Sequence, residues 1–311
     1  MQIGMVGLGR MGMNMTLRLL RGRHTVIAYN RTPQKVNELV KKGAKGAYTL
    51  EELVSFLKPP RHIWIMLPAG NPVDDTISKL KGLLRKGDTI IDGGNSFYKD
   101  DIRREQQLSP LGIHYMDAGV SGGIWGLKIG YCLMIGGAKK DFKRLEPAFK
   151  TLAPKEGYLY CGPAGAGHFV KMVHNGVEYG MMSAYGEGFE LLSESPYSGV
   201  LDLEKVAHLW NQGSVVRSWL LELAESAFKK DKDLLKIGGY VEDSGEGRWT
   251  LQQAIDTGVP APVISAALFQ RFRSRKTDPL SDRVLAALRN EFGGHAVLRK
   301  NAGGTKKGKK V

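Results

Sequence analysis

The sequence predicts an α/β fold in which a doubly wound, mostly parallel sheet is followed by an all-helical C-terminal domain. Three observations support this prediction. Short apolar runs alternate with helical-period segments up to about residue 162, a turn-forming Gly162-Pro163-Ala164-Gly165 follows, and only helix-compatible segments come after it. We therefore expect one domain at residues 1–163, a second at 164–298, and a basic disordered tail at 299–311.

The expected strands are apolar runs rich in β-branched residues and bounded by turn residues. Helices should lie between most of them; for example, Thr32-Pro33 provides a cap and a first helical residue. This alternation is typical of a parallel sheet covered on both faces. The strands are expected at Ile3–Gly7, Thr25–Tyr29, Ile63–Leu67, Thr89–Asp92, His114–Val120 and Tyr131–Ile135.

The second half of the chain contains helical patterns and no internal repeat of solenoid length. A long helix is expected from Ala166 to about Leu192. Shorter helices are expected at Leu203–Trp210, Val215–Lys230, Trp249–Thr257, Val263–Ser274 and Asp282–Asn290.

Composition is that of an ordinary globular protein, with 42% hydrophobic and 24% charged residues among 311. No apolar run is long enough for a transmembrane helix, and the N-terminus lacks the pattern of a secretory signal. Cys132 and Cys161 have no metal-type spacing and are expected to be reduced thiols. These features predict a cytoplasmic protein.

The net charge of +14 is concentrated partly in the C-terminal tail, where residues 299–311 contain six basic residues and no acid. A glycine- and lysine-rich tail cannot bury apolar surface. It is interpreted as a solvated tail, with electrostatic capture of nucleic acid or acidic partners as the alternative. The remaining positive charge suits polyanionic ligands.

Gly7-Leu8-Gly9-Arg10-Met11-Gly12 matches G-x-G-x-x-G between the first expected strand and the first helix. This context predicts a Rossmann-type dinucleotide site, with the pyrophosphate at the helix N-terminus. A glycine-rich turn without a ligand is the alternative.

The end of the second strand reads Tyr29-Asn30-Arg31-Thr32 and offers no carboxylate for the ribose of NAD. A guanidinium can hold a 2′-phosphate with charge-assisted hydrogen bonds. The sequence therefore favours NADP, while NAD stays possible if Arg31 is a surface residue without a role.

The long helix after residue 165 places Lys171, Asn175 and Glu178 in one stripe, flanked by His174 and Tyr179. Because the neighbouring residues are apolar or small, the helix is expected to be packed on most sides. Such a stripe suits oxidation of an alcohol, with lysine as the base and Glu178 as a proton donor in a second step. A solvated Lys/Glu pair is the alternative.

Two loops are expected at the carboxyl ends of strands, which face the ligand crevice of an open α/β sheet. Asp92-Gly93-Gly94-Asn95-Ser96 and Ser121-Gly122-Gly123 would offer Asn95 and Ser121 to hydroxyl or carboxylate groups, with glycines that let the ligand come close. Tight turns without ligand contact are the alternative.

Together these motifs resemble the 6-phosphogluconate dehydrogenase family, within the β-hydroxyacid dehydrogenases. Lys171-Met172-Val173-His174-Asn175-Gly176-Val177-Glu178-Tyr179-Gly180 is the most specific string, and Phe292-Gly293-Gly294-His295 extends the resemblance to the C-terminus. The resemblance implies NADP-dependent, metal-free oxidative decarboxylation of 6-phosphogluconate to ribulose 5-phosphate in the pentose phosphate pathway. Lys171 would be the base, Glu178 the acid, and Asn175 a third catalytic residue.

The resemblance also assigns binding roles residue by residue. Arg289 and His295 match a pair that the family inserts into a neighbouring subunit, which implies a homodimer or a larger oligomer. The sugar acid is assigned to Asn95, Ser121, Gly122, Gly123, His174, Asn175, Arg289 and His295, its phosphate to Tyr179 and Arg271, and the cofactor to Gly7, Leu8, Gly9, Met11, Gly12, Asn30, Arg31, Thr32, Leu67 and Asn95.

The chain departs from the long members of the family in three ways. It lacks their duplicated helical half and resembles the short bacterial type. Ser244 stands where the family has a phosphate-binding lysine, which Arg248 would replace. Met66-Leu67-Pro68-Ala69-Gly70 lacks the lysine of the family's Met-Val-Lys-Ala-Gly string.

Two other functions remain open at this point. One is a β-hydroxyacid dehydrogenase that acts on an unphosphorylated acid without decarboxylation, against which Tyr179, Arg271 and Arg289 argue. The other is a dinucleotide sensor or a nucleic-acid binder that uses the tail, although the tail has no aromatic residues and no binding motif.

Overall fold

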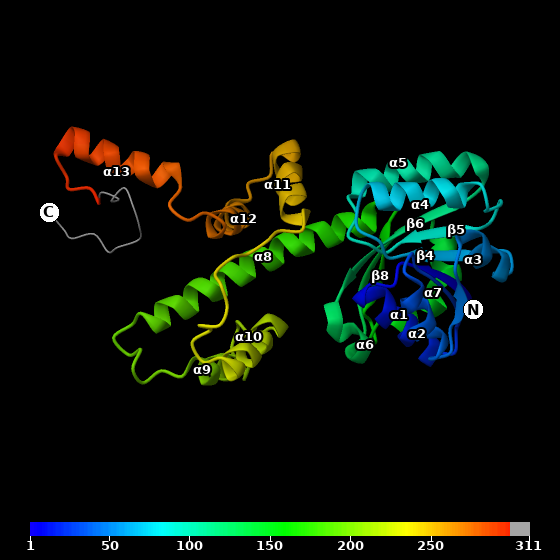
Figure 1. Ribbon diagram of the computed structural model, residues 1–311, viewed down its shortest axis with the longest axis horizontal. Coiled ribbons are helices and arrows are strands. Elements are labelled where there is room, and N and C mark those ends of the chain that lie inside the picture. The colour runs from blue at the N-terminus through cyan, green and yellow to red at the C-terminus, as the bar shows by residue number, and fades with distance from the viewer. Residues whose placement is uncertain (299–311) are drawn as a thin grey trace. The chain divides into compact units, whose positions relative to one another are not determined.

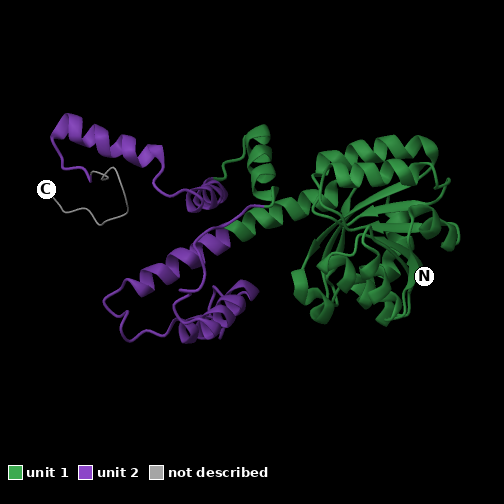
Figure 2. Ribbon diagram, viewed as in Figure 1, with its two compact units in different colours: residues 1–179, 244–261 green, residues 180–243, 262–311 purple. Residues whose placement is uncertain are grey.

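The computed structural model describes residues 1–298 and divides them into two compact units. The first unit contains residues 1–179 and 244–261, and the second contains 180–243 and the chain from residue 262 onward (Figure 2). The boundary between the two units lies within the long helix rather than at residue 163. The domain boundaries expected from the sequence therefore stay a prediction. The basic tail at 299–311 lies outside the described residues.

The first unit is built on an eight-stranded sheet with the order β3-β2-β1-β4-β5-β6-β7-β8 (Figure 1). All neighbouring strands are parallel except β6 and β7, which pair antiparallel with Val120 opposite Leu133. The predicted α/β sheet is therefore confirmed. The strands are β1 Gln2–Val6, β2 Thr25–Tyr29, β3 Lys45–Ala47, β4 His62–Ile65, β5 Thr89–Asp92, β6 His114–Ser121, β7 Cys132–Gly137 and β8 Tyr158–Gly162.

Helices cover both faces of this sheet (Figure 1). One apolar core contains residues of α1, α2 and α7, including Met15, Val36 and Phe149, and the other contains residues of α3, α4 and α5. The covering helices are α1 Arg10–Arg21, α2 Pro33–Val40, α3 Leu50–Phe56, α4 Asn71–Lys81, α5 Tyr98–Leu108, α6 Gly126–Ile129 and α7 Lys139–Leu152, with 3₁₀ turns at Ser109–Leu111 and Gly123–Trp125.

Two strands were absent from the prediction. β3 is a three-residue Lys-Gly-Ala segment without a β-branched residue, so no pattern indicates it. β8 lies at the edge of the sheet and none of its residues is fully buried. Its Tyr-Leu-Tyr segment does favour a strand, so the sequence analysis overlooked this element.

The long helix α8, Ala166–Ser193, begins in the first unit and continues into the second. α11, Glu246–Thr257, belongs to the first unit and starts three residues earlier than predicted. The second unit contains α9 Leu203–Trp210, α10 Trp219–Lys230, α12 Pro262–Ser274 and α13 Leu280–Gly293. α10 starts at Trp219 rather than at Val215 because Ser218 caps it, its hydroxyl accepting from Leu221 N.

The second unit has a small core in which Phe189 of α8 packs against Phe228 of α10, with Ala207 and Leu221 beside them. Helix α13, in contrast, has no buried residue, and Val284, Leu288 and Phe292 are exposed at helical spacing. Apolar residues of α8 are exposed as well, Val177 at 51%. The expectation that α8 is packed on most sides is therefore wrong for the single chain.

No helix among the described residues is long and apolar enough to cross a membrane. Both cysteines are free thiols; Cys132 is exposed and Cys161 is half-buried.

Candidate active site

Lys171 and Asn175 lie one turn apart on the buried side of α8, in the part that belongs to the first unit. The ammonium Nζ of Lys171 donates to Asn175 Oδ1 at 2.7 Å, and the two residues are only 6% and 8% exposed. Burial lowers the pKa of Lys171 below its usual value, whereas the charges of Glu178 and Glu246 act in the opposite direction. A buried lysine with a lowered pKa is suited to accept a proton from a hydroxyl.

His174 and Glu178 lie beside this pair, as the helical spacing predicts. His174 Nδ1 is 3.0 Å from Asn175 Oδ1 and 3.8 Å from the Glu178 carboxylate. On its other side, His174 Nε2 lies 3.5 Å from Ser121 Oγ at the end of β6. The structure therefore brings Ser121 together with the α8 stripe, while the Glu178 side chain stays 38% exposed and open to solvent.

A second carboxylate, Glu246, was missed by the sequence analysis. It is the first residue of α11, is 2% exposed, and accepts from Asn175 Nδ2 at 3.0 Å. Its other oxygen accepts from the hydroxyl of Ser244. In the sequence Glu246 stands between two glycines at the start of a helix, a pattern that indicates a turn. Nothing in this pattern shows that the Glu246 carboxylate is buried beside α8.

Tyr179 is buried at the end of the same stripe. Its ring lies against Gly247, where an added Cβ would come within 2.5 Å, and its hydroxyl accepts from the backbone N–H of Ser244 at 3.3 Å. Ser244, which the resemblance aligns with a phosphate-binding lysine, therefore lies close to the Tyr179 hydroxyl. Arg248 follows it on α11 and is exposed.

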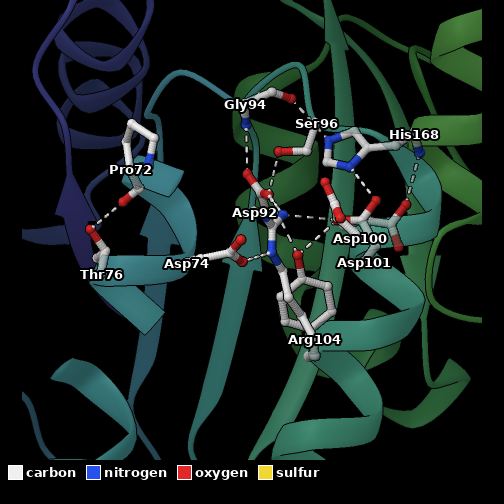
Figure 3. A network of polar contacts seen from close by, with 12 residues as sticks. Pro72, Asp74, Thr76, Asp92, Gly94, Ser96, Asp100, Asp101, Arg104 and His168 are labelled. Atoms are coloured by element: carbon white, nitrogen blue, oxygen red, sulfur yellow. Dashed lines mark hydrogen bonds and ion pairs between the residues drawn. The ribbon is translucent and has the colours of Figure 1, made fainter. Parts of the chain in front are cut away.

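The loop that presents Asn95 is fixed from below by Asp92 (Figure 3). Asp92 Oδ1 accepts from Gly94 N at 3.0 Å, and Oδ2 accepts from Ser96 Oγ at 2.6 Å. Arg104 of α5, fully buried, neutralises Asp92 through Nη1 at 3.0 Å and also reaches Asp74. Asn95 itself is exposed at the tip of this loop.

His168 connects this loop to α8 (Figure 3). Its Nε2 lies 2.9 Å from Gly94 O and its Nδ1 lies 2.7 Å from Asp101 Oδ2, while the backbone N–H groups of Gly165 and His168 donate to Asp117. Burial opposes the charge of the ring, but the carboxylates of Asp101, Asp92 and Asp117 together outweigh it and raise the pKa of His168 to about 10. The charged ring thus joins the helix of Lys171 to the loop of Asn95.

Asp92, Asp101 and His168 place three donor atoms within 4.8 Å of one another, which is metal-like spacing. The positive charge at this cluster is already supplied by Arg104, and both ring nitrogens of His168 have protein partners. The cluster therefore acts as an internal ion-pair network. Independence of the reaction from metal ions stays a prediction.

The glycine loop between β1 and α1 is tightly packed except at one glycine. A Cβ on Gly7 would lie 2.4 Å from Met66 O, and one on Gly12 would lie 2.0 Å from Gly7 O, so these glycines are required by packing. A Cβ on Gly9, the N-cap of α1, would meet nothing within 4 Å. The open space at Gly9 and the free N–H groups of α1 fit a pyrophosphate.

Other predicted cofactor residues surround this loop. Asn30 Oδ1 accepts from Leu8 N at 2.9 Å, so Asn30 shapes the loop, and Leu67 lies beside Gly7. Arg31 and Thr32 are exposed at the end of β2, and Thr32 precedes α2 without capping it through its side chain. Met11 is half-buried in the first turn of α1.

The glycines of the two expected ligand loops are required for different structural reasons. A Cβ on Gly93 would lie 2.1 Å from Trp64 Nε1, and one on Gly94 would lie 2.6 Å from Leu67 O. Packing therefore requires these two glycines, and the approach of a ligand to them stays a prediction. At Gly123 the φ of +51° favours glycine and nothing lies within 4 Å of an added Cβ, so that turn is open. Gly122, at φ +130°, is held against Gly130 and Tyr131.

Three predicted substrate residues belong to the second unit and are described there alone. Arg271 of α12 donates to Glu242 O at 2.8 Å. Arg289 and His295 meet at the end of α13, where His295 N donates to Arg289 O at 3.4 Å, and both are exposed. Their substrate roles stay predictions.

Comparison with known proteins places these features in context. YqeC of Bacillus subtilis, named provisionally as a 6-phosphogluconate dehydrogenase, is 49% identical over 96% of this chain and 100% of its own. The NAD⁺-dependent, decarboxylating 6-phosphogluconate dehydrogenase of Haloferax volcanii is 44% identical over 97% of this chain and 100% of its own. Two longer Bacillus subtilis relatives, each 39% identical over 88% of this chain and 61% of their own, are named NAD⁺- and NADP⁺-dependent.

A solved structure shows the same fold over nearly the whole chain. The Plasmodium falciparum 6-phosphogluconate dehydrogenase, studied in apo form and with NADP⁺ or 6-phosphogluconate, aligns with a TM-score of 0.82 at 30% identity. The alignment covers 98% of this chain and 67% of that one.

Family models agree with both halves of the architecture. Residues 2–162 match the NAD binding domain of 6-phosphogluconate dehydrogenase, and residues 167–284 match the C-terminal domain of 6-phosphogluconate dehydrogenase. The chain therefore belongs to the 6-phosphogluconate dehydrogenase family.

Proposed function

We propose that this protein catalyses the oxidative decarboxylation of 6-phospho-D-gluconate to D-ribulose 5-phosphate and CO₂, with NADP as the oxidant, as a step of the pentose phosphate pathway. The observation that supports this most directly is the buried amine of Lys171, hydrogen-bonded to Asn175 in a chain that belongs to this family. Lysine as base and glutamate as acid are what the two proton transfers of this reaction require.

In the first step Lys171, as the neutral amine, takes the proton of the C3 hydroxyl. The nicotinamide, when bound, accepts the hydride from C3, and the alcohol becomes a ketone. Asn175 holds the amine in place through Oδ1. The residues that would hold the dinucleotide are Gly9 and the first turn of α1, with Arg31, Thr32 and Leu67 around it.

In the second step the protonated Lys171 donates to the C3 ketone oxygen. The bond between C1 and C2 breaks, CO₂ leaves, and its electron pair forms an enediol. Glu178 then gives a proton to the carbon that becomes C1 of ribulose 5-phosphate, and Lys171 takes back the proton on the oxygen of the former C3 as the ketone of the product forms. Because the ammonium supplies the positive charge that draws off these electrons, we propose that no metal ion takes part.

We propose that the sugar acid is held by polar groups around this stripe and that its phosphate lies near Tyr179. Tyr179 is close to Ser244, and the cations for the phosphate would come from Arg271 and, from a second copy of the chain, Arg289 with His295. The other proposed contacts are Asn95, Ser121, Gly122, Gly123 and His174.

The competing function is oxidation of an unphosphorylated 3-hydroxy acid, and Arg271 separates the two. Replacing Arg271 with alanine should raise the KM for 6-phosphogluconate by roughly ten- to a hundredfold, since a charge-assisted contact to phosphate is lost. The KM for gluconate, which lacks the phosphate, should change less than twofold. Steady-state rates on both acids measure this, and equal effects would favour the competing function.

We propose a preference for NADP because Arg31 and Thr32 are exposed at the end of β2 and no carboxylate precedes α2 there. Since relatives are named for either cofactor, this preference needs its own test. Changing Arg31 to aspartate should lower kcat/KM for NADP by at least about tenfold, by repulsion of the 2′-phosphate, and raise it for NAD. An unchanged NADP/NAD ratio would refute the role of Arg31.

We propose that the active form is at least a dimer. The apolar residues Val284, Leu288 and Phe292 of α13 and Val177 of α8 are exposed in the single chain, and a second copy would cover them. Light scattering at working concentration should give a mass at least twice 34.2 kDa. A mass of one chain in an active preparation would contradict this proposal.

A further inference from the structure

Glu246 has no part in the reaction proposed above, yet it is one of the most deeply buried carboxylates of the first unit. It is 2% exposed, at the first position of α11, where the helix N-terminus favours a negative charge. Its Oε1 accepts from Asn175 Nδ2 at 3.0 Å, and its other oxygen accepts from Ser244. A buried charge with such specific partners calls for a role.

The hydrogen bonds determine which way the Asn175 amide faces. An ionised carboxylate can only accept, so the amide must present its N–H₂ group to Glu246. The carbonyl Oδ1 then faces Lys171 Nζ at 2.7 Å and accepts from it. If the amide were reversed, its N–H₂ group would point at the amine and compete with it as a donor. Glu246 therefore fixes the acceptor that holds the Lys171 amine.

The electrostatic surroundings of Lys171 add a second effect. The charged or titratable groups that act on the ammonium are Glu178 on its own helix, Glu246 on α11 and the Cys132 thiol on β7, with His174 beside Glu178. Glu178 is 38% exposed and screened by solvent, whereas Glu246 is buried. The charge of Glu246 thus offsets part of the pKa decrease that burial imposes on Lys171.

We propose that Glu246 is a positioning residue that orients the Asn175 amide and, through it, the amine of Lys171 for proton transfer. This inference rests on the proposed function, in which Lys171 is the base. Without Glu246 the Asn175 N–H₂ group loses its acceptor, and the surroundings of Lys171 contain one buried negative charge fewer. The reaction would lose rate rather than substrate affinity.

Three variants separate positioning from a merely structural role. Glu246→Gln keeps the shape and can still accept from Asn175, but removes the charge. Glu246→Ala removes the acceptor and leaves the Asn175 N–H₂ group without it. Glu51→Gln removes the same charge from the first turn of α3, where the residue is exposed, and is the matched control.

The measurements are the pH profile of kcat/KM with 6-phosphogluconate and the ¹³C titration of the Lys171 ε-carbon in protein with labelled lysine, assigned with Lys171→Met. For Glu246→Gln we expect the titration midpoint and the acidic limb of the profile to move together to lower pH, because loss of a nearby anion lowers a lysine pKa. For Glu246→Ala we expect kcat to fall roughly ten- to a hundredfold with KM within about twofold. Glu51→Gln should match the parent protein in both.

Unchanged midpoints and an unchanged kcat in folded Glu246→Gln, with circular dichroism as the check of folding, would overturn the inference. The ¹³C titration needs no substrate and therefore separates two failures. If the midpoint moves as expected while the parent protein does not turn over 6-phosphogluconate, the link between Glu246 and Lys171 stands and the proposed reaction fails.

Discussion

Single side chains in this protein are held in their charge states by burial and by partners that come from other elements. Burial lowers the pKa of Lys171, whereas Asp101 and the neighbouring carboxylates raise the pKa of His168, three residues earlier on the same helix, to about 10. The two residues face different networks, so one helix presents the proposed base to the candidate site and a protonated imidazole to the fold.

His168 predicts a pH dependence of stability. Its pKa is about 10 in the folded protein, against about 6.5 when unfolded, so the stabilisation is full below pH 6.5 and is lost as pH rises toward 10. The free energy of unfolding should fall by a few kcal/mol over this window. In His168→Gln, whose side chain does not titrate, this contribution should be missing and stability lower already at pH 6.5.

Urea unfolding at pH 6.5, 8 and 9.5 measures this difference. Lys171, with its lowered pKa, titrates in the opposite sense and is present in both proteins, so the comparison isolates His168. Parallel pH dependence in the two proteins would show that His168 is not the protonated group.

The sequence predicted the residues of the site that are neighbours on one helix. Lys171, Asn175 and Glu178 lie close together because residues three and four positions apart share one face of a helix. Glu246 could not be predicted in this way, since it reaches Asn175 from a helix 71 residues later in the chain. The same holds for Asp117, which binds the start of α8 from β6.

At the scale of elements, the turn between β1 and α1 shows how one motif combines packing and binding. Gly7 and Gly12 are glycines because the backbone of the turn leaves no space for a Cβ, and Gly9 is a glycine although the fold leaves space. The space at Gly9 is what the proposed contact with a pyrophosphate requires.

Two alanine substitutions test this division. Gly9→Ala should leave the melting temperature within about 2 °C, because its φ of −65° and ψ of −178° suit alanine, while the KM for the dinucleotide rises at least about tenfold. Gly12→Ala should destabilise the protein by about 1–3 kcal/mol, because the added methyl meets Gly7 O. Thermal melts and cofactor titration of both variants measure this; a Gly9→Ala protein with normal cofactor affinity would refute the site.

Most elements with a strong strand or helix pattern were predicted close to the bounds that they have in the structure. β2 and β5 have the bounds that their β-branched runs predict, and α9 has the bounds that its helical period predicts. β3 is determined by pairing with β2 rather than by its own composition, whereas β8, which pairs with β7, contains two tyrosines that favour a strand. Pairing of this kind is a tertiary effect and leaves no trace in a short window of sequence.

On the scale of the whole molecule, the first unit contains the dinucleotide loop, the Lys171 stripe and Glu246, whereas the cations proposed for the phosphate belong to the second. Helix α13 has no buried residue, so packing within a single chain does not account for its apolar face. The sequence indicated a helix there and could not show that its apolar face lacks a partner within the chain.

The central claim is that this protein joins oxidation of 6-phosphogluconate to loss of its carboxyl group at Lys171. The most direct measurement uses 6-phosphogluconate labelled with ¹³C at C1, with NADP or NAD and a chelator present, and follows reduced cofactor and labelled CO₂ together. We predict one CO₂ for each reduced cofactor in the parent protein and a fall in both of at least about a thousandfold in Lys171→Met. Cofactor reduction without labelled CO₂, or equal rates in the two proteins, would contradict the account.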